Sequence, residues 1–151
     1  MTHYDFNKDL KDGQYLENKI LEIFIDNQIH ARLINSRSYD MVVIKGDITI
    51  PIEIKNDIMS GYTDNVAIEF EYNTKPSGIQ TTEADYWFIS IGGEIYSFSV
   101  DILQHLIFTY KYIRIIKGGD DKKSLMYLFG KDFLIEYGEK LEEWIKWFHK
   151  I

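Results

Sequence analysis

The residues best suited to chemistry lie in the segment SYDMVVIKGDITIPIEIKND, residues 38–57. The Gly-Asp pair at 46–47 suits the loop of a two-residue type II′ hairpin, with a strand on each side of it. In that hairpin Asp40 lies opposite Glu53, and directly opposed residues have Cβ atoms about 4.5–5.5 Å apart. Lys55 follows Glu53 by two residues, so its side chain lies on the same face. The spacing therefore predicts two carboxylates and one ammonium group close together at the end of a sheet.

Two facing carboxylates destabilise a sheet unless a cation lies between them. Their hard oxygen atoms suit Mg²⁺. A one-residue shift in register would move Asp40 to the other face, so this prediction depends on the turn. The alternative is a solvated strand face, on which a Glu-x-Lys salt bridge contributes less than about 1 kcal/mol. Metal chemistry is favoured by the position of Asp40 at the head of the preceding strand, and by the isoleucines on the opposite face of the second strand.

The elements that position these residues follow from the spacing of apolar residues. Helical spacing predicts a first helix over 15–28, after a turn at 12–13, and an amphipathic closing helix within 136–151. A continuous apolar run at 85–91 indicates a strand covered on both faces. The succession of helix, strands, short helix, strands and helix predicts an α/β sandwich around a mixed sheet. The remaining predicted elements are strands at 41–44, 48–55, 66–72, 95–100, 112–116 and 125–129 and a helix at 101–110.

Length, cysteine content and charge limit the class of protein. The chain has 151 residues, the length of one ordinary domain, and the absence of cysteine excludes a disulfide scaffold, a thiolate zinc site and a cysteine nucleophile. A net charge of −7 argues against a broadly basic nucleic-acid binder, but it allows a local basic groove beside a metal-binding carboxylate cluster. No apolar run approaches the ~20 residues of a membrane span, and the first five residues do not begin a secretion signal. We therefore expect a cytoplasmic protein without a membrane partner.

The acidic and basic residues also form a pattern that resembles the PD-(D/E)xK nuclease superfamily. The matching residues are Glu17 in YLENK, Asp40 in SYD, and Glu53-Ile54-Lys55 in EIK, and the order of elements extends the resemblance to about residue 91. The stretch AIEFEYNTKPSGIQTTEADYW looks like small phage-encoded endonucleases and relatives of Holliday-junction resolvases. Tyr39 stands where the name of the superfamily has Pro, a substitution that many members share. The resemblance implies a restriction-endonuclease-like core, with one nuclease-like domain over residues 1–151.

The resemblance also implies roles for individual residues. Asp40 and Glu53 would bind one or two Mg²⁺ ions together with the backbone carbonyl of Ile54, and Mn²⁺ would substitute. Such an ion lowers the pKa of its bound water and neutralises charge on the scissile phosphate. Lys55 would position or activate that water and stabilise the developing charge. Glu17 would complete the metal shell through a second ion or a water, although a glutamate on a helix is commonly a surface residue.

A second group of polar residues follows the predicted strand at 66–72. Ser77 could cap a short helix there, and a helix N-terminus with free N–H groups accepts phosphate readily. The alternative is an ordinary capped loop with a solvated lysine. In the superfamily that this sequence resembles, the helix after the third strand often borders the active site, so we expect DNA contacts from Lys75, Ser77, Gly78, Gln80 and Thr81.

The later part of the chain contains a group of basic residues: Lys111, Arg114, Lys117, Lys122 and Lys123. They form either a duplex-binding stripe or a solvated hairpin, and both interpretations are open.

These observations together favour a Mg²⁺-dependent DNA endonuclease that cuts internally and selects for DNA structure, as a junction resolvase or a nicking enzyme does. Resolving a junction needs two active sites, so we expect a C2 homodimer in the cytoplasm, or in the host cytoplasm if the protein is phage-encoded. The aromatic closing helix is either the dimer interface or part of the core. One alternative is a catalytically silent relative that acts as a phage accessory factor and binds DNA or protein. Another is an acidic mimic of DNA.

Overall fold

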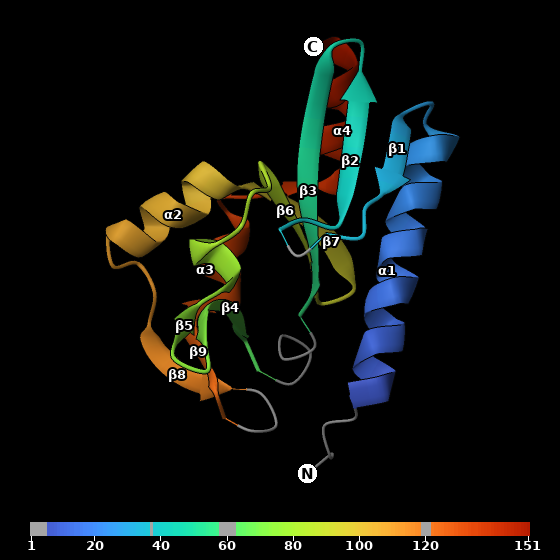
Figure 1. Cartoon of the computed structure of the whole chain (residues 1–151). Helices are drawn as coiled ribbons and strands as arrows, with labels where there is room; N and C mark the ends of the chain where they lie inside the picture. The colour runs from blue at the N-terminus through green and yellow to red at the C-terminus, as the bar shows by residue number, and fades with distance from the viewer. Residues whose placement is uncertain (1–5, 37, 58–62, 119–121) are drawn as a thin grey trace.

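Two β-sheets form the centre of the protein in the computed structural model, which describes residues 6–36, 38–57, 63–118 and 122–151 (Figure 1). The first five residues, on which the expectation about secretion rests, lie outside these ranges. Figure 1 shows the smaller sheet to the left of the long β2–β3 hairpin and the first helix, α1, to its right. Within the described ranges, no helix combines the length and the apolar character needed to cross a membrane.

The larger sheet has six strands and is mixed, as the sequence predicts. Among its described strands, β3 and β6 pair in parallel and all other neighbours are antiparallel. The order across the sheet is β1 (His30–Leu33), β2 (Met41–Lys45), β3 (Ile48–Asn56), β6 (Tyr86–Ile91), β7 (Glu94–Ser99) and β10 (Glu139–Lys140).

The smaller sheet is antiparallel, and the sequence predicts three of its four strands but does not assign them to a separate sheet. Its order is β5 (Lys75–Pro76), β4 (Asn65–Tyr72), β9 (Ser124–Gly130) and β8 (Arg114–Gly118). The pairing of β4 with β9 has an irregularity between Glu69 and Glu71, where one residue is inserted into β4. Such a bulge increases the local twist of a strand.

The helical segments of the described residues are α1 (Phe6–Asp26), the 3₁₀ turn η2 (Gly78–Gln80), α2 (Val100–Phe108), α3 (Lys131–Ile135) and α4 (Leu141–Lys150). The turn predicted at 12–13 is wrong, because α1 runs through these residues. A Cβ added at Gly13 would meet no atom within 4 Å, so this position is open. A glycine in an open helical position costs only about 1 kcal/mol relative to alanine, which is too little to end a helix.

Two hydrophobic cores lie on opposite faces of the larger sheet. One contains residues of α1 and α4 with β2 and β3, and the other joins the larger sheet to the smaller sheet and α2. Strand β6 contributes Phe88 to the first core and Trp87 to the second, so the expectation of a strand covered on both faces is confirmed. The apolar stripe of α4 is buried within the chain, where Trp144 lies 5.6 Å from Phe24 of α1 between ring centroids. This stripe therefore belongs to the core, and the homodimer stays a prediction.

Candidate active site

The β2–β3 hairpin has the predicted register. Met41 pairs with Ile52, and Lys45 pairs with Ile48 across a two-residue turn. Gly46 has φ +60° at the first loop position, a backbone conformation that glycine adopts without steric cost. The residue before Met41 continues the pairing, since the Asp40 N–H donates to the Ile52 carbonyl at 2.9 Å. The hairpin therefore brings Asp40 to the part of β3 that carries Glu53.

The Asp40 carboxylate is held against the backbone of β3. Its Oδ2 accepts a hydrogen bond of 2.8 Å from the Ile54 N–H. In an extended strand, the N–H and the C=O of one residue point to the same side, so the Ile54 carbonyl lies on the same side of β3 as the N–H that Asp40 accepts. The Ile54 side chain stands out of the plane of the sheet and is buried in the first core. This geometry fits a cation held by Asp40 and the Ile54 carbonyl, which are two of the predicted ligands.

Glu53 and Lys55 lie on the face of β3 opposite to the isoleucines. The Lys55 Nζ is 3.4 Å from Glu53 Oε1, and the Glu53 side chain is only 13% exposed. The same Nζ lies 5.6 Å from the centroid of the Trp87 ring on the adjacent strand β6. The predicted position of Lys55 beside Glu53 is therefore found in the structure.

The three predicted acids influence one another electrostatically. Burial is the main cause that raises the pKa of Glu53, opposed by the charge of Lys55 and reinforced by Asp40 and Glu17. Burial also raises the pKa of Asp40, against the opposing effects of the Ile54 hydrogen bond and the Lys55 charge. The pKa of Glu17 on α1 is raised by burial and then by the charge of Asp40. The fold thus brings Glu17 close enough to interact with the acids of the hairpin.

This donor set suits an ion that keeps part of its hydration shell. Among the residues that the structure describes, no group of three or more His, Cys, Asp or Glu side chains could by itself hold a metal ion. Mg²⁺ in proteins commonly takes one or two carboxylates and completes its shell with water and substrate phosphate oxygens. Two carboxylates with raised pKa values and one backbone carbonyl fit that requirement, and a divalent cation would relieve the repulsion between the acids.

Ser77 lies at the N-cap position of η2, as expected, but the expected capping hydrogen bond of its side chain is not formed. Its hydroxyl makes no capping hydrogen bond to η2 and instead donates to Glu69 Oε2 at 3.1 Å. Gly78 has φ +54°, and a Cβ there would lie 2.1 Å from the Glu69 backbone oxygen, so the chain passes too close to β4 for any side chain. Ser124 donates to the other carboxylate oxygen, Oε1, at 2.7 Å. Ser77 and Gly78 therefore have a structural role in fastening this loop to β4, and their contact with DNA stays a prediction.

The segment after η2 borders the hairpin that carries the acids. The Glu83 N–H donates to the Ser38 carbonyl at 3.2 Å, and the Asp85 N–H donates to the Pro51 carbonyl at 2.9 Å. Ser38 lies two residues before Asp40. The predicted DNA-contacting segment therefore leads directly to the site, and its exposed members are Lys75, Gln80 and Thr81.

Arg114 and Lys117, from the later basic group, lie on β8, at the edge of the smaller sheet. They belong to a different sheet from the acids. Sequence reasoning also missed Trp87, which lies in the apolar run at 85–91 and is indicated there only as part of a strand covered on both faces. Nothing in the spacing of residues along the chain reveals that Trp87 pairs with Glu53, because the β3–β6 pairing joins distant segments.

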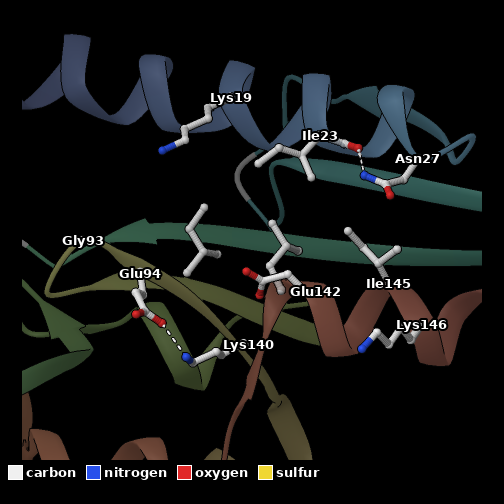
Figure 2. A pocket seen from close by; sticks show the side chains of 11 residues that line it. Lys19, Ile23, Asn27, Gly93, Glu94, Lys140, Glu142, Ile145 and Lys146 are labelled. Carbon is white, nitrogen blue, oxygen red and sulfur yellow. Dashed lines mark hydrogen bonds and ion pairs between the residues drawn. The ribbon is translucent and has the colours of Figure 1, made fainter.

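A hollow of about 550 Å³ lies elsewhere, between α1, α4 and the turn after β6 (Figure 2). Its apolar lining includes Ile23 and Ile145, and its rim carries an ion pair of 3.2 Å between Lys140 and Glu94. Lys19 of α1 also lines it, but none of the four side chains predicted to act in catalysis does. The candidate site is therefore identified by its chemistry and not by the size of a cavity.

The sequence matches no protein-family model and no curated protein. The structure is similar to that of Hjc, a Holliday junction resolvase from Archaeoglobus fulgidus, with a TM-score of 0.53 and 12% sequence identity. The similarity covers 89% of this chain and 96% of Hjc. The protein thus has a restriction-endonuclease-like fold, a mixed central sheet with flanking helices, and the expected fold class is confirmed.

Proposed function

We propose that the protein is a Mg²⁺-dependent DNA endonuclease whose active site consists of Asp40, Glu53, Lys55 and Glu17. The observation that carries this proposal is the hairpin register, which gathers Asp40, the Ile54 backbone and the Glu53–Lys55 pair at one place. The similarity in fold to a Holliday junction resolvase supports a structure-selective enzyme that resolves DNA junctions or nicks DNA.

Each residue has a task that follows from its position. Asp40, Glu53 and the Ile54 carbonyl would hold the cation, and Glu17 would bind through a second ion or a water. When bound, the ion supplies a water of lowered pKa and positive charge against the scissile phosphate. The Lys55 ammonium, held 3.4 Å from Glu53, would orient that water and stabilise negative charge that develops on the phosphate. Lys55 thus adds a fixed positive charge on the side of the site formed by β3.

DNA contacts would come from the segment that follows β4. Lys75 supplies a cation at the exposed strand β5, and polar groups come from Gln80, the last residue of η2, and from Thr81 directly after it. Ser77 and Gly78 hold the segment against Glu69, so their contribution would be to the shape of this surface. A homodimer would present two such sites to the two strands that must be cut.

The test is cleavage of a supercoiled plasmid and of a four-way junction with Mg²⁺ or Mn²⁺. Wild type is compared with Glu53→Ala, Lys55→Ala and the control Lys140→Ala, which removes an exposed lysine of an ion pair at the rim of the distant hollow. The proposal expects cleavage by wild type and by the control, and at least about a hundredfold loss in the two site variants. Cleavage that survives both site substitutions would contradict it.

The second candidate is a catalytically silent relative that binds DNA or protein as a phage accessory factor. The net charge of −7 favours it, since this charge opposes non-specific association with a duplex. This candidate predicts junction or protein binding without cleavage, and no binding of divalent ions. The retention of Asp40, Glu53 and Lys55 together favours the endonuclease, because a protein that only binds has no need of all three.

A further inference from the structure

Trp87 lies beside the candidate site but is not among the residues proposed to bind the cation, the water or DNA. In the parallel pairing of β3 and β6, Glu53 is the partner of Trp87, and Lys55 is the partner of Ile89. Paired residues in neighbouring strands share a face of the sheet, so the indole lies on the face that carries Glu53 and Lys55. Trp87 itself is 2% exposed and belongs to the second core.

The Lys55 ammonium lies between a carboxylate and this indole. Its Nζ is 3.4 Å from Glu53 Oε1 and 5.6 Å from the centroid of the Trp87 ring. A cation within about 6 Å of an indole is attracted by the negative face of the ring, and Trp attracts more strongly than Tyr or Phe. The Lys55 side chain is otherwise half-exposed and long, so these two contacts restrict where its charge can lie.

The indole is fixed in turn by the segment that precedes it. The Trp87 Nε1–H donates to the Thr82 Oγ1 at 3.1 Å, and the same oxygen accepts a hydrogen bond of 3.2 Å from the Ala84 N–H. The Thr82 hydroxyl therefore ties both the ring and the local backbone together. An aliphatic residue in place of Trp87 would fill part of the core but would neither attract the ammonium nor reach Thr82.

We propose that Trp87 is a positioning residue, which holds the Lys55 ammonium at the reacting phosphate through its indole face and is itself oriented by Thr82. This inference rests on the proposed endonuclease function for its effect on cleavage. Its geometric part does not, because the position of Lys55 over the indole can be measured in the protein without DNA or metal.

The geometric test is NMR of the protein labelled with ¹³C at lysine Cε, without divalent ions. The Lys55 signal is assigned by its disappearance in Lys55→Arg. Protons above an aromatic ring are shielded, so we expect the Lys55 Hε resonance upfield of that of Lys146, which pairs with Glu143. The upfield shift should vanish in Trp87→Leu and persist at reduced size in Trp87→Phe, which keeps an aromatic face but loses the hydrogen bond to Thr82. A Lys55 resonance that coincides with the other lysines in wild type would overturn the inference, whether or not the protein cleaves DNA.

The catalytic test separates the rate of cleavage from DNA binding. Under saturating junction, we expect Trp87→Leu to lower kcat about tenfold while junction affinity, measured in Ca²⁺, stays within about twofold, because a small displacement of a catalytic group is costly. Trp87→Phe should lose much less, since it keeps an aromatic face. Equal kcat in Trp87→Leu and wild type, or an equal loss of kcat and affinity, would overturn the inference.

A second pair of variants covers the case in which Trp87→Leu does not fold. Thr82→Val removes the acceptor for the indole N–H, and Thr82→Ser keeps it. We expect a lower kcat and a changed Lys55 Hε shift in Thr82→Val, and rescue of both in Thr82→Ser. Unchanged values in Thr82→Val would contradict the role of Thr82, and with it the proposed orientation of the ring. If wild type does not cleave any substrate while Lys55 is shielded, the endonuclease proposal fails and the geometry stands.

Discussion

Glu53 and Glu69 are two half-buried glutamates on strands of different sheets, and their surroundings differ. Both carboxylate oxygens of Glu69 accept hydrogen bonds from serine hydroxyls, at 3.1 Å from Ser77 and 2.7 Å from Ser124. Glu53 has one polar partner among the described residues, Lys55 at 3.4 Å. Because both of its carboxylate oxygens already accept hydrogen bonds within the chain, Glu69 has a structural role.

The neighbours of Glu53 add to this difference. The charges of Asp40 and Glu17 both act to raise the pKa of Glu53, and burial is the largest cause of its rise. The fold therefore keeps these acids together at a cost in stability. Such an arrangement is typical of sites that bind a cation or carry out proton transfer. Glu53 therefore has the surroundings expected of a residue that a bound ligand would complete, whereas Glu69 is already satisfied by two serine hydroxyls.

The largest expected effect is on DNA cleavage, which should depend on the acids of the β2–β3 hairpin and not on Glu69. Asp40→Asn keeps the size of the side chain but removes the charge that the proposed cation needs, so we expect a loss of cleavage of about a thousandfold. Glu69→Gln should change cleavage by less than about threefold, because an amide oxygen can still accept one serine hydroxyl. Single-turnover cleavage of a labelled junction measures both rates. Similar losses in the two variants would show that Glu69 matters for cleavage as much as Asp40 does.

The next largest effect is on stability, for which Glu69 should matter more than Glu53. Glu69→Ala leaves the buried Ser124 hydroxyl without its acceptor and frees the loop at Ser77, so we expect a loss of about 2 kcal/mol in the free energy of unfolding. Glu53→Ala removes a desolvated charge and should leave stability unchanged or raise it slightly. Urea unfolding in the presence of a chelator measures both. Glu71→Ala, on the same strand as Glu69, is the matched control, with an expected change below about 0.5 kcal/mol.

A smaller effect is expected at Glu17, the acid of α1. Its pKa is raised first by burial and then by the charge of Asp40, so it belongs electrostatically to the site. As a ligand through water or a second ion, it should matter less than Asp40, and Glu17→Gln should lower cleavage about tenfold. The loss should shrink as the Mg²⁺ concentration rises. Glu22→Gln, on the same helix, serves as the control and should cleave like wild type.

The smallest effect is on the pH dependence of stability without metal. A raised pKa means that the folded state binds protons at a higher pH than the unfolded chain does, so its stability rises as the pH falls through the raised pKa. The extra stability of Glu53→Gln over wild type should therefore shrink between neutral pH and the ordinary glutamate value of 4.5. The measurement is urea unfolding of both proteins across this range with a chelator. A difference that does not depend on pH would show that Glu53 has the same pKa in the folded and unfolded states.

The sequence predicts the hairpin site because that site is local. A two-residue turn with glycine first fixes the register, and the register alone brings Asp40 to Glu53 and Lys55. The closing helix is also predictable, since its four apolar residues recur at helical spacing and are buried.

What the sequence does not predict depends on contacts between distant segments. Strand β4 has the alternating pattern of a strand, but the pattern does not show that it pairs with β9 in a second sheet. In the same way, Trp87 looks like an ordinary core residue until the parallel pairing with β3 places it beside Glu53. The short edge strand β1 is mostly exposed, so it lacks the alternation that marks a strand. The Ser77 hydroxyl makes no capping hydrogen bond because the side chain is turned toward β4, where it donates to Glu69, eight residues earlier.

The most direct measurement of the central claim is Mn²⁺ binding to the free protein, followed by electron paramagnetic resonance, for wild type, Asp40→Asn, Glu53→Gln and Glu69→Gln. We expect wild type and Glu69→Gln to bind the ion alike, and each of the other two variants to bind at least about tenfold more weakly. If wild type binds no Mn²⁺, or if Asp40→Asn and Glu53→Gln bind it as tightly as wild type, the acids of the β2–β3 hairpin do not form a metal site.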